Sequence, residues 1–178
     1  MGTFRQEHVW LLLRTGLVWV IFITACVALV VPSSVSVSAN VSISSIDPTG
    51  RIAAGDKHTC AIAANDTIWC WGDNTYSQLG SSAFVDEFSL TPIQTTSLPG
   101  ARIAKRIVAG ANHTCVLATD GTVWCWGQNG SGNLGIGSFL NQGDPVRADL
   151  GGTAVVISAG GSTSCAALSD DSLKCWGK

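Results

Sequence analysis

The residues best suited to chemistry are six cysteines that form three pairs, each pair ten residues apart. They are Cys60 with Cys70, Cys115 with Cys125, and Cys165 with Cys175. In the first two copies a histidine, His58 or His113, lies two residues before the first cysteine. Such side chains could form disulfides, bind a metal ion, or act as a nucleophile with its base.

The way the pattern repeats disfavours a metal site and a nucleophile. The third copy has Thr163 in place of the histidine, and the CxxC pairs of zinc sites are absent. A disulfide-bonded cysteine cannot be a nucleophile, and a catalytic pair would not normally be copied along a chain. Adjacent acids such as Asp86 and Glu87 would point to opposite faces of a strand. We therefore expect no metal, no cofactor and no enzyme activity, and we expect the histidines to bond neighbouring backbone or loop groups.

The residues around each cysteine pair predict a β-hairpin. In the second copy the apolar-rich stretch 113–118 is followed by the turn 119–121 and the β-branched and aromatic stretch 122–126. A hairpin centred on Asp120 places Cys115 opposite Cys125, with Cα atoms about 4.5–5.5 Å apart. That separation suits a disulfide. The same count applies to the other copies, so we predict three disulfides, each within one hairpin.

Each hairpin belongs to a longer repeat. The copies begin at Ile52, Ile107 and Ile157, which are 55 and 50 residues apart. We expect repeat copies near 50–104, 105–154 and 155–178, the third being truncated. Trp69 and Trp124 become Lys174 in the third copy, which predicts that this face of the repeat is exposed.

A polar loop follows the Cys-Trp-Gly motif in the first two copies and supplies the candidate binding residues. These are Asn74, Tyr76, Ser77 and Gln78 in the first copy, and Asn129, Ser131 and Asn133 in the second. The alternative is that they only satisfy backbone groups of the turns. The second loop also matches GxGxxG over 130–135, but no helical pattern follows it, as a dinucleotide site requires.

The N-terminal part predicts export. Arg5 and Arg14 flank an uncharged 15-residue run, Leu17–Val31, and small residues follow as far as Ala39. Residues 1–39 are expected to be a signal peptide cleaved after Ala39 or an uncleaved membrane anchor, with a lipoprotein site at Cys26 or a buried helix as minor alternatives. Residues 40–49 are expected to be a Ser-rich spacer. Export would place the rest of the chain in a disulfide-forming compartment.

Composition excludes further classes of protein. The 178-residue chain is 46% apolar and 12% charged, with net charge −2. So apolar a chain has enough surface to bury, which argues against disorder. Without a basic excess it has nothing to neutralise nucleic-acid phosphates, so we expect no nucleic-acid partner.

The repeated pattern AG-x-x-HTC, nine residues, CWG-x-N-x-x-x-x-LG resembles the repeat of the regulator of chromosome condensation family. It is most similar to the Cys-containing version in secreted bacterial proteins and in the crinkly repeats of plant receptor kinases. The resemblance covers about residues 50–178. It implies an all-β fold built as a β-propeller, typically of seven four-stranded blades. Ser77, Asn133 and Thr163 depart from the family pattern.

The resemblance implies a binding function more than a reaction. The best-known member is a nuclear guanine-nucleotide exchange factor for a small GTPase, and other members are binding platforms, including a secreted bacterial inhibitor of β-lactamases. The predicted export signal and disulfides argue against a function in the nucleus. We expect an extracytoplasmic, non-enzymatic scaffold that binds a protein or glycan at a propeller rim, with membrane contact only through an uncleaved N-terminal segment. The alternatives are nucleotide exchange on a GTPase, and a carbohydrate-binding or enzyme-inhibitor module.

The repeat length also predicts an incomplete propeller. At roughly 50 residues a blade, residues 50–178 provide about two and a half blades, whereas propellers close with typically four to eight. We expect the chain to be part of a longer protein, with self-association into a ring or an open stack as alternatives.

Overall fold

Residues 50–178 are described by the structure, a computed structural model, and they form an all-β fold, as predicted. The strands are β1 (Ile52–Ala54), β2 (His58–Ile62), β3 (Ile68–Asp73), β4 (Phe88–Gln94), β5 (Ala104–Ala109), β6 (His113–Ala118), β7 (Val123–Gly127), β8 (Gln142–Arg147), β9 (Ala154–Gly160), β10 (Thr163–Leu168) and β11 (Leu173–Gly177). This part of the chain contains no helix with the length and hydropathy of a membrane span. The predicted signal or anchor (1–39) and spacer (40–49) lie outside the described residues.

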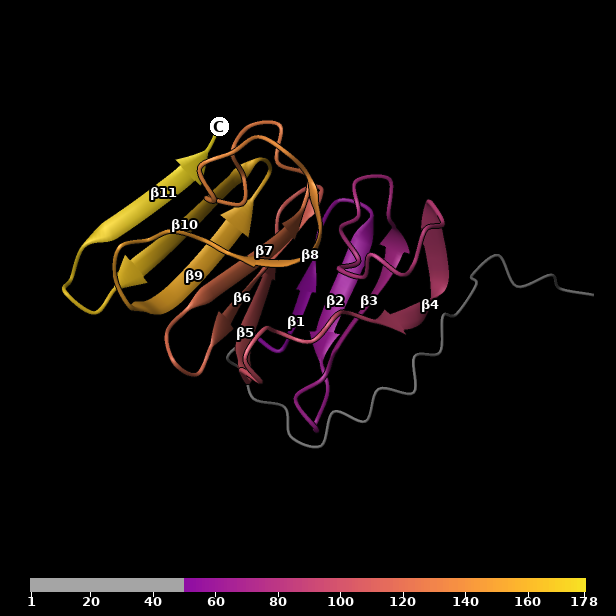
Figure 1. Ribbon diagram of the computed structural model, residues 1–178, viewed down its shortest axis with the longest axis horizontal. Helices are drawn as coiled ribbons and strands as arrows, with labels where there is room; N and C mark the ends of the chain where they lie inside the picture. The colour runs from indigo at the N-terminus through magenta and orange to yellow at the C-terminus, as the bar shows by residue number, and fades with distance from the viewer. Residues whose placement is uncertain (1–49) are drawn as a thin grey trace, which may run out of the picture. The chain divides into compact units, whose positions relative to one another are not determined.

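The strands form three antiparallel sheets, one for each copy of the repeat (Figure 1). Sheet 1 has the order β1-β2-β3-β4, sheet 2 the order β5-β6-β7-β8, and sheet 3 the order β9-β10-β11. The first strand of one sheet meets the first two strands of the sheet before it, because β5 contacts β1 and β2, and β9 contacts β5 and β6. Each sheet therefore stands beside the next with its first strand on a common inner side.

A disulfide joins the two middle strands of every sheet, with the predicted pairing. Cys60 is bonded to Cys70, Cys115 to Cys125, and Cys165 to Cys175. Their Cα atoms are 4.0–4.1 Å apart, closer than the predicted 4.5–5.5 Å. The bonds from the Ala118 amide to the Thr122 carbonyl and from the Gln128 amide to the Asn112 carbonyl set the register. They leave Cys115 and Cys125 at a position where the strands do not exchange hydrogen bonds and approach most closely.

The outermost strands of sheets 1 and 2 each contain a proline. Pro92 lies inside β4 and Pro145 inside β8, and each of these strands pairs on one side only. An edge strand tolerates proline because the missing N–H would point to solvent. Both strands begin before the proline, at Phe88 and Gln142.

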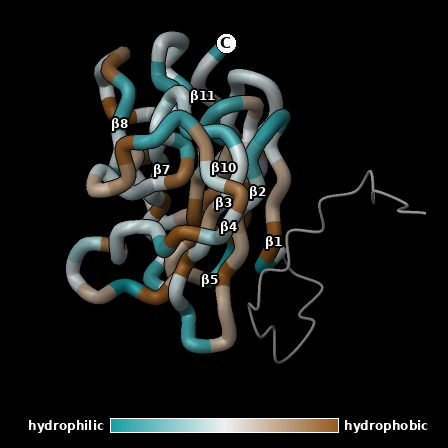
Figure 2. Tube along the Cα trace, turned by 90° about the vertical axis from the view of Figure 1, so that its right-hand side faces the viewer, coloured by the Kyte–Doolittle hydropathy of each residue, from teal (hydrophilic) through white to brown (hydrophobic). Residues whose placement is uncertain are grey.

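The core lies between the sheets, because each sheet buries one face against the next. Ile62 and Ile68 of sheet 1 pack with Ile107, Val116 and Trp126 of sheet 2. A second cluster joins sheets 2 and 3 through Leu117, Val123, Ile157, Ala166 and Leu168. Figure 2 shows that apolar segments occur along the strands and also in some loops. Stability therefore comes from stacking neighbouring repeats, as in other repeat proteins.

We predict that the Cys60–Cys70 disulfide, which is buried, stabilises the stack. The double variant Cys60→Ala, Cys70→Ala should lower the free energy of unfolding by about 2 kcal/mol, because it frees an 11-residue loop in the unfolded chain. Urea unfolding followed by tryptophan fluorescence would measure the loss. The control is Gln94→Ala, at an exposed position of β4. Equal midpoints for the double variant and the control would contradict the prediction.

Candidate functional site

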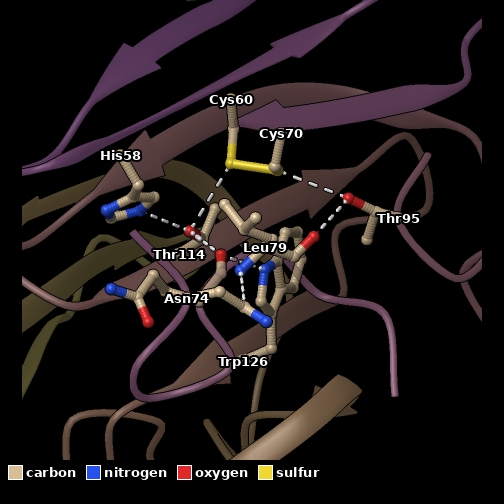
Figure 3. Close-up of a disulfide and its surroundings, with 9 residues drawn as sticks. His58, Cys60, Cys70, Asn74, Leu79, Thr95, Thr114 and Trp126 are labelled. Carbon is tan, nitrogen blue, oxygen red and sulfur yellow. Dashed lines mark hydrogen bonds between the residues drawn. A yellow bond between two sulfur atoms is a disulfide. The ribbon is translucent and has the colours of Figure 1, made fainter. Parts of the chain in front are cut away.

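The histidine of sheet 1 reaches across to sheet 2. His58 Nε2 lies 2.9 Å from the Thr114 hydroxyl, and that hydroxyl donates to the backbone carbonyl of Gln78 at 3.1 Å (Figure 3). Because the Thr114 proton is directed at the carbonyl, the histidine must donate through Nε2–H. The histidine was expected to bond neighbouring backbone or loop groups, and it instead bonds a side chain of the next sheet.

The same chain of hydrogen bonds recurs between sheets 2 and 3. His113 Nε2 lies 2.8 Å from the Ser164 hydroxyl, which donates to the Asn133 carbonyl at 3.1 Å. A Ser–His pair at this distance could suggest a nucleophile and its base. However, Ser164 is only 1% exposed and its proton is already committed to a carbonyl. The pair is therefore part of the packing between sheets.

Burial keeps both histidines neutral. It lowers the pKa of His58 and His113 from 6.5 to about 4, although Asp73 and Asp56 act in the opposite direction at His58. Nδ1 of each ring is buried and has no hydrogen-bond partner within residues 50–178. A proton added there would be a buried charge with no acceptor, which is costly.

Tryptophans supply a second donor to the same two carbonyls. Trp126 Nε1 donates to the Gln78 carbonyl at 2.9 Å, and Trp176 Nε1 donates to the Asn133 carbonyl at 2.8 Å. Gly80 makes room for the first indole: its φ is +76°, and a Cβ there would lie 2.6 Å from Trp126 Nε1. Gly135 does the same in the second copy, where a Cβ would lie 2.9 Å from Trp176 Nε1, so the glycine that ends each polar loop makes room for the tryptophan of the next repeat.

Four of the predicted binding residues lie inside the loops. The Asn74 amide donates to the Phe84 and Asp86 carbonyls, and the Asn129 amide donates to the Ser138 and Leu140 carbonyls. These two side chains, with those of Gln78 and Asn133, are at most 7% exposed.

The remaining bonds of these amides also stay within the loops. Gln78 and Asn133 accept from the backbone amides of Tyr76 and Ser131. Tyr76, Ser77 and Ser131 are half-buried at the loop surface. The four buried amides therefore shape the loop instead of facing a partner.

The large apolar side chains that these loops expose to solvent were not identified from the sequence. They are Val85 in the loop between β3 and β4, and Phe139 and Leu140 in the loop between β7 and β8, all more than 70% exposed. Each loop tip is held by two bonds from its buried asparagine, so Val85 and Phe139 occupy equivalent places. The sequence signal that could have pointed to them is the presence of large apolar residues within loops that are otherwise rich in polar residues and glycine.

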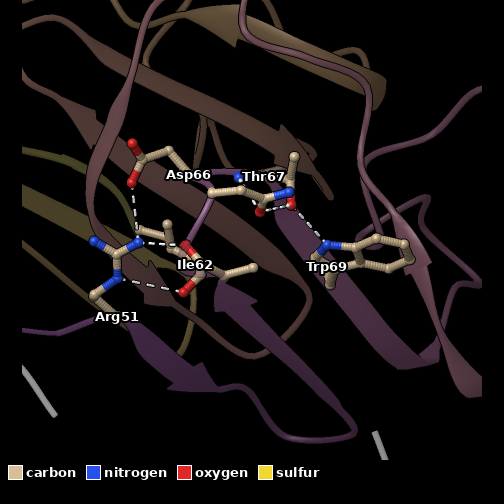
Figure 4. Close-up of polar contacts among 7 residues, drawn as sticks. Arg51, Ile62, Asp66, Thr67 and Trp69 are labelled. Carbon is tan, nitrogen blue, oxygen red and sulfur yellow. Dashed lines mark hydrogen bonds and ion pairs between the residues drawn. The ribbon is translucent and has the colours of Figure 1, made fainter. Parts of the chain in front are cut away.

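At the opposite rim, where the β2–β3 and β6–β7 turns lie, arginine and aspartate side chains form salt bridges. Arg51 bonds the Ile62 carbonyl and forms a salt bridge with Asp66, next to the Thr67–Trp69 hydrogen bond (Figure 4). In the second copy Arg102 pairs with Asp120 at 2.8 Å and lies over the ring of Trp124.

This arrangement corrects one expectation about the tryptophan face. Trp124 is only 7% exposed and Trp69 is half-buried, so the predicted exposure of this face is wrong for Trp124. The arginine and the neighbouring sheet cover the ring, which the Lys174 replacement could not indicate. Lys174 itself is exposed. Within residues 50–178 no cluster of three or more His, Cys, Asp or Glu is placed to bind a metal.

We predict that the Thr114 hydroxyl stabilises the contact between sheets 1 and 2. Thr114→Val should lower the free energy of unfolding by about 1–3 kcal/mol, because His58 and the Gln78 carbonyl lose a buried partner. The matched control is Thr59→Val at the same repeat position of sheet 1, where the side chain is half-buried. Chemical denaturation would measure the free energy of unfolding of both variants, and an equal loss in the two would contradict the prediction.

We also predict acid sensitivity from the buried histidines. Their folded-state pKa lies below the unfolded value, so unfolding takes up protons, and the stability they contribute is complete above pH 6.5 and lost as the pH falls toward 4. The loss amounts to about 3 kcal/mol for each histidine. The free energy of unfolding, measured by denaturant titration across this range, should depend less on pH in His113→Gln. That variant keeps a donor for Ser164 but does not titrate. An unchanged slope would rule out the assignment.

Comparison with known proteins agrees with this geometry. Two family models, both described as the regulator of chromosome condensation (RCC1) repeat, match the chain. One matches residues 65–117 and 120–167, and the other matches residues 51–78 and 104–133. Over 132 residues the chain is 33% identical to the RCC1 domain-containing protein RUG3, mitochondrial, of Arabidopsis thaliana, which covers 73% of this chain and 29% of that protein. It is 37% identical over 97 residues to the ultraviolet-B receptor UVR8 of the same plant, covering 54% and 21%.

A solved structure shows the same fold. Prp20p from Saccharomyces cerevisiae, whose structure is described with its binding properties to Gsp1p and histones, superposes with a TM-score of 0.64 at 23% identity. The match covers 71% of this chain and 32% of that one. The chain thus spans less than a third of the length of these three relatives. With repeat models matching more than half of its residues, the chain belongs to the regulator of chromosome condensation (RCC1) repeat family.

Proposed function

We propose that this chain works outside the cytoplasm as a non-enzymatic scaffold that binds a partner protein through the loops of one propeller rim. The observation that carries the proposal is the disulfide in the middle of each of the three sheets. Disulfides persist in oxidising compartments and are rare in cytosolic and nuclear proteins. The uncharged run Leu17–Val31 agrees with an export signal.

Binding is favoured over catalysis because the groups suited to chemistry are already engaged. The cysteines are oxidised, and the two histidines are buried and bonded between sheets. What remains accessible on the rim is a set of loops held rigidly by buried amides. Binding residues concentrate on such loops when a rigid scaffold positions them.

The yeast relative supports a protein as the partner class. Prp20p is described with its binding to Gsp1p and histones, so a propeller built from these repeats can recognise proteins. Those partners are not assigned to this chain, which spans a third of that protein or less. Guanine-nucleotide exchange is the alternative drawn from the family. The predicted export signal and the disulfides favour an extracytoplasmic protein over this intracellular activity.

We predict that the mature protein, collected from the extracytoplasmic fraction of an export-competent host, has no alkylatable thiol among residues 50–178. Iodoacetamide treatment after unfolding without reductant, followed by mass spectrometry, should modify none of the six repeat cysteines, and should modify all six after reduction. Six free thiols would remove the extracytoplasmic assignment. Acceleration of GDP release from purified small GTPases would remove the scaffold assignment in favour of exchange.

A further inference from the structure

Two neighbouring loops of one rim present apolar side chains to solvent. Val85, in the β3–β4 loop, is 87% exposed, and Phe139 and Leu140, in the β7–β8 loop, are 72% and 73% exposed. We call these three residues the apolar crown. Phe88, at the start of β4, extends it and is 60% exposed.

The crown is built by the repeat itself. Asn74 donates to the carbonyls of Phe84 and Asp86, on either side of Val85. Asn129 donates to the carbonyls of Ser138 and Leu140, on either side of Phe139. In each loop the buried amide holds the two flanking peptides from inside, and the residue between them points away.

The neighbouring sheet fixes the crown without covering it. The Ser82 amide donates to the Asp144 carboxylate at 3.0 Å, and Thr96 donates to the same oxygen, so the β3–β4 loop is tied to β8 of sheet 2. A Cβ on Gly143 would lie 3.5 Å from Ser82 Cβ, which places the start of β8 against this loop. Val85 is 87% exposed with sheet 2 in place, so sheet 2 does not cover it.

The loops that carry the crown contain charged side chains of one sign only. Asp86 and Glu87 follow Val85 directly and are exposed, and neither loop, 74–87 or 128–141, contains a Lys or Arg. The two salt bridges found within residues 50–178 both lie on the opposite rim, at Arg51 and Arg102. The carboxylates beside the crown are therefore free to meet a cationic partner.

We propose that the apolar crown is the docking surface for a polypeptide segment that carries apolar side chains next to Lys or Arg. The crown residues enter an apolar contact, and Asp86 and Glu87 pair with the basic side chains. A membrane is disfavoured because these carboxylates would face an anionic lipid surface. The inference rests on the proposed scaffold function and names its surface and partner chemistry.

Selection from a phage library of random dodecapeptides on the immobilised full-length protein tests the proposal. Peptides that combine aliphatic or aromatic residues with Lys or Arg should be enriched. Their affinity should fall about tenfold or more for the triple variant Val85→Ser, Phe139→Ser, Leu140→Ser, because the substitutions remove the apolar surface that the contact would bury. Asp86→Asn with Glu87→Gln should weaken binding several-fold, mainly at low salt, because exposed charges are screened.

Two controls keep the outcomes distinct. Ile103→Ser removes an apolar side chain that is 48% exposed on the opposite rim and should leave binding unchanged. Thermal melting should be the same for all variants because every changed side chain is exposed. The charge pair Asp86→Asn, Glu87→Gln alters no apolar contact and gives an independent reading should the triple variant fold poorly.

Other outcomes overturn the inference. If the selected peptides bind the triple variant as tightly as the wild type, the crown is not the docking surface. If Ile103→Ser weakens binding, the docking surface lies on the opposite rim, and the proposed scaffold function still holds. Crown-dependent sedimentation with phosphatidylcholine vesicles, without peptide enrichment, would assign the surface to lipid. Failure to enrich any peptide would also overturn it. The scaffold function itself is decided separately by the thiol and GDP-release measurements.

Discussion

Two backbone carbonyls, those of Gln78 and Asn133, are the points on which the stacking of the sheets depends. Each carbonyl accepts one hydrogen bond from a hydroxyl and one from an indole N–H of the next sheet. Each of these hydroxyls also accepts a hydrogen bond from a histidine Nε2–H. The carbonyls and hydroxyls are buried, so losing one partner leaves another polar atom unsatisfied at a cost of about 1–3 kcal/mol. Contact between sheets is thus specified by polar geometry as well as by apolar packing, which by itself would tolerate sliding.

The same carbonyls couple the sheet contacts to the rim. Gln78 and Asn133 belong to the polar loops, and their side chains accept from backbone amides two residues earlier. A loop that changed shape would carry its carbonyl away from the next sheet. The disulfide contributes to this network, since Cys60 Sγ lies 3.7 Å from the Thr114 hydroxyl and Cys70 Sγ lies 3.3 Å from that of Thr95. Rim loops built in this way are rigid enough to present side chains in a fixed arrangement.

The departures from the repeat pattern are tolerated at identifiable places. Ser77 has φ +62°, a left-handed conformation that suits glycine, and the equivalent residue of the second copy is Gly132 with φ +77°. The loop keeps its shape because the surrounding hydrogen bonds hold Ser77 there. Thr163 replaces the histidine on the face of sheet 3 that does not contact sheet 2, so neither contact described within residues 50–178 loses its histidine.

The hairpins and their disulfides could be predicted from local sequence. The β-branched and aromatic stretches, the turn at Asp120 and the ten-residue cysteine spacing determined them, because register within a hairpin depends on residues close in sequence. The role of the polar loop residues did not follow. Whether Asn74 faces a partner or the inside of its loop depends on carbonyls ten to twelve residues away. Only tertiary structure also decided that His58 bonds Thr114, 56 residues along the chain, and that Val85 and Phe139 come to the surface, since these depend on how separate repeats pack.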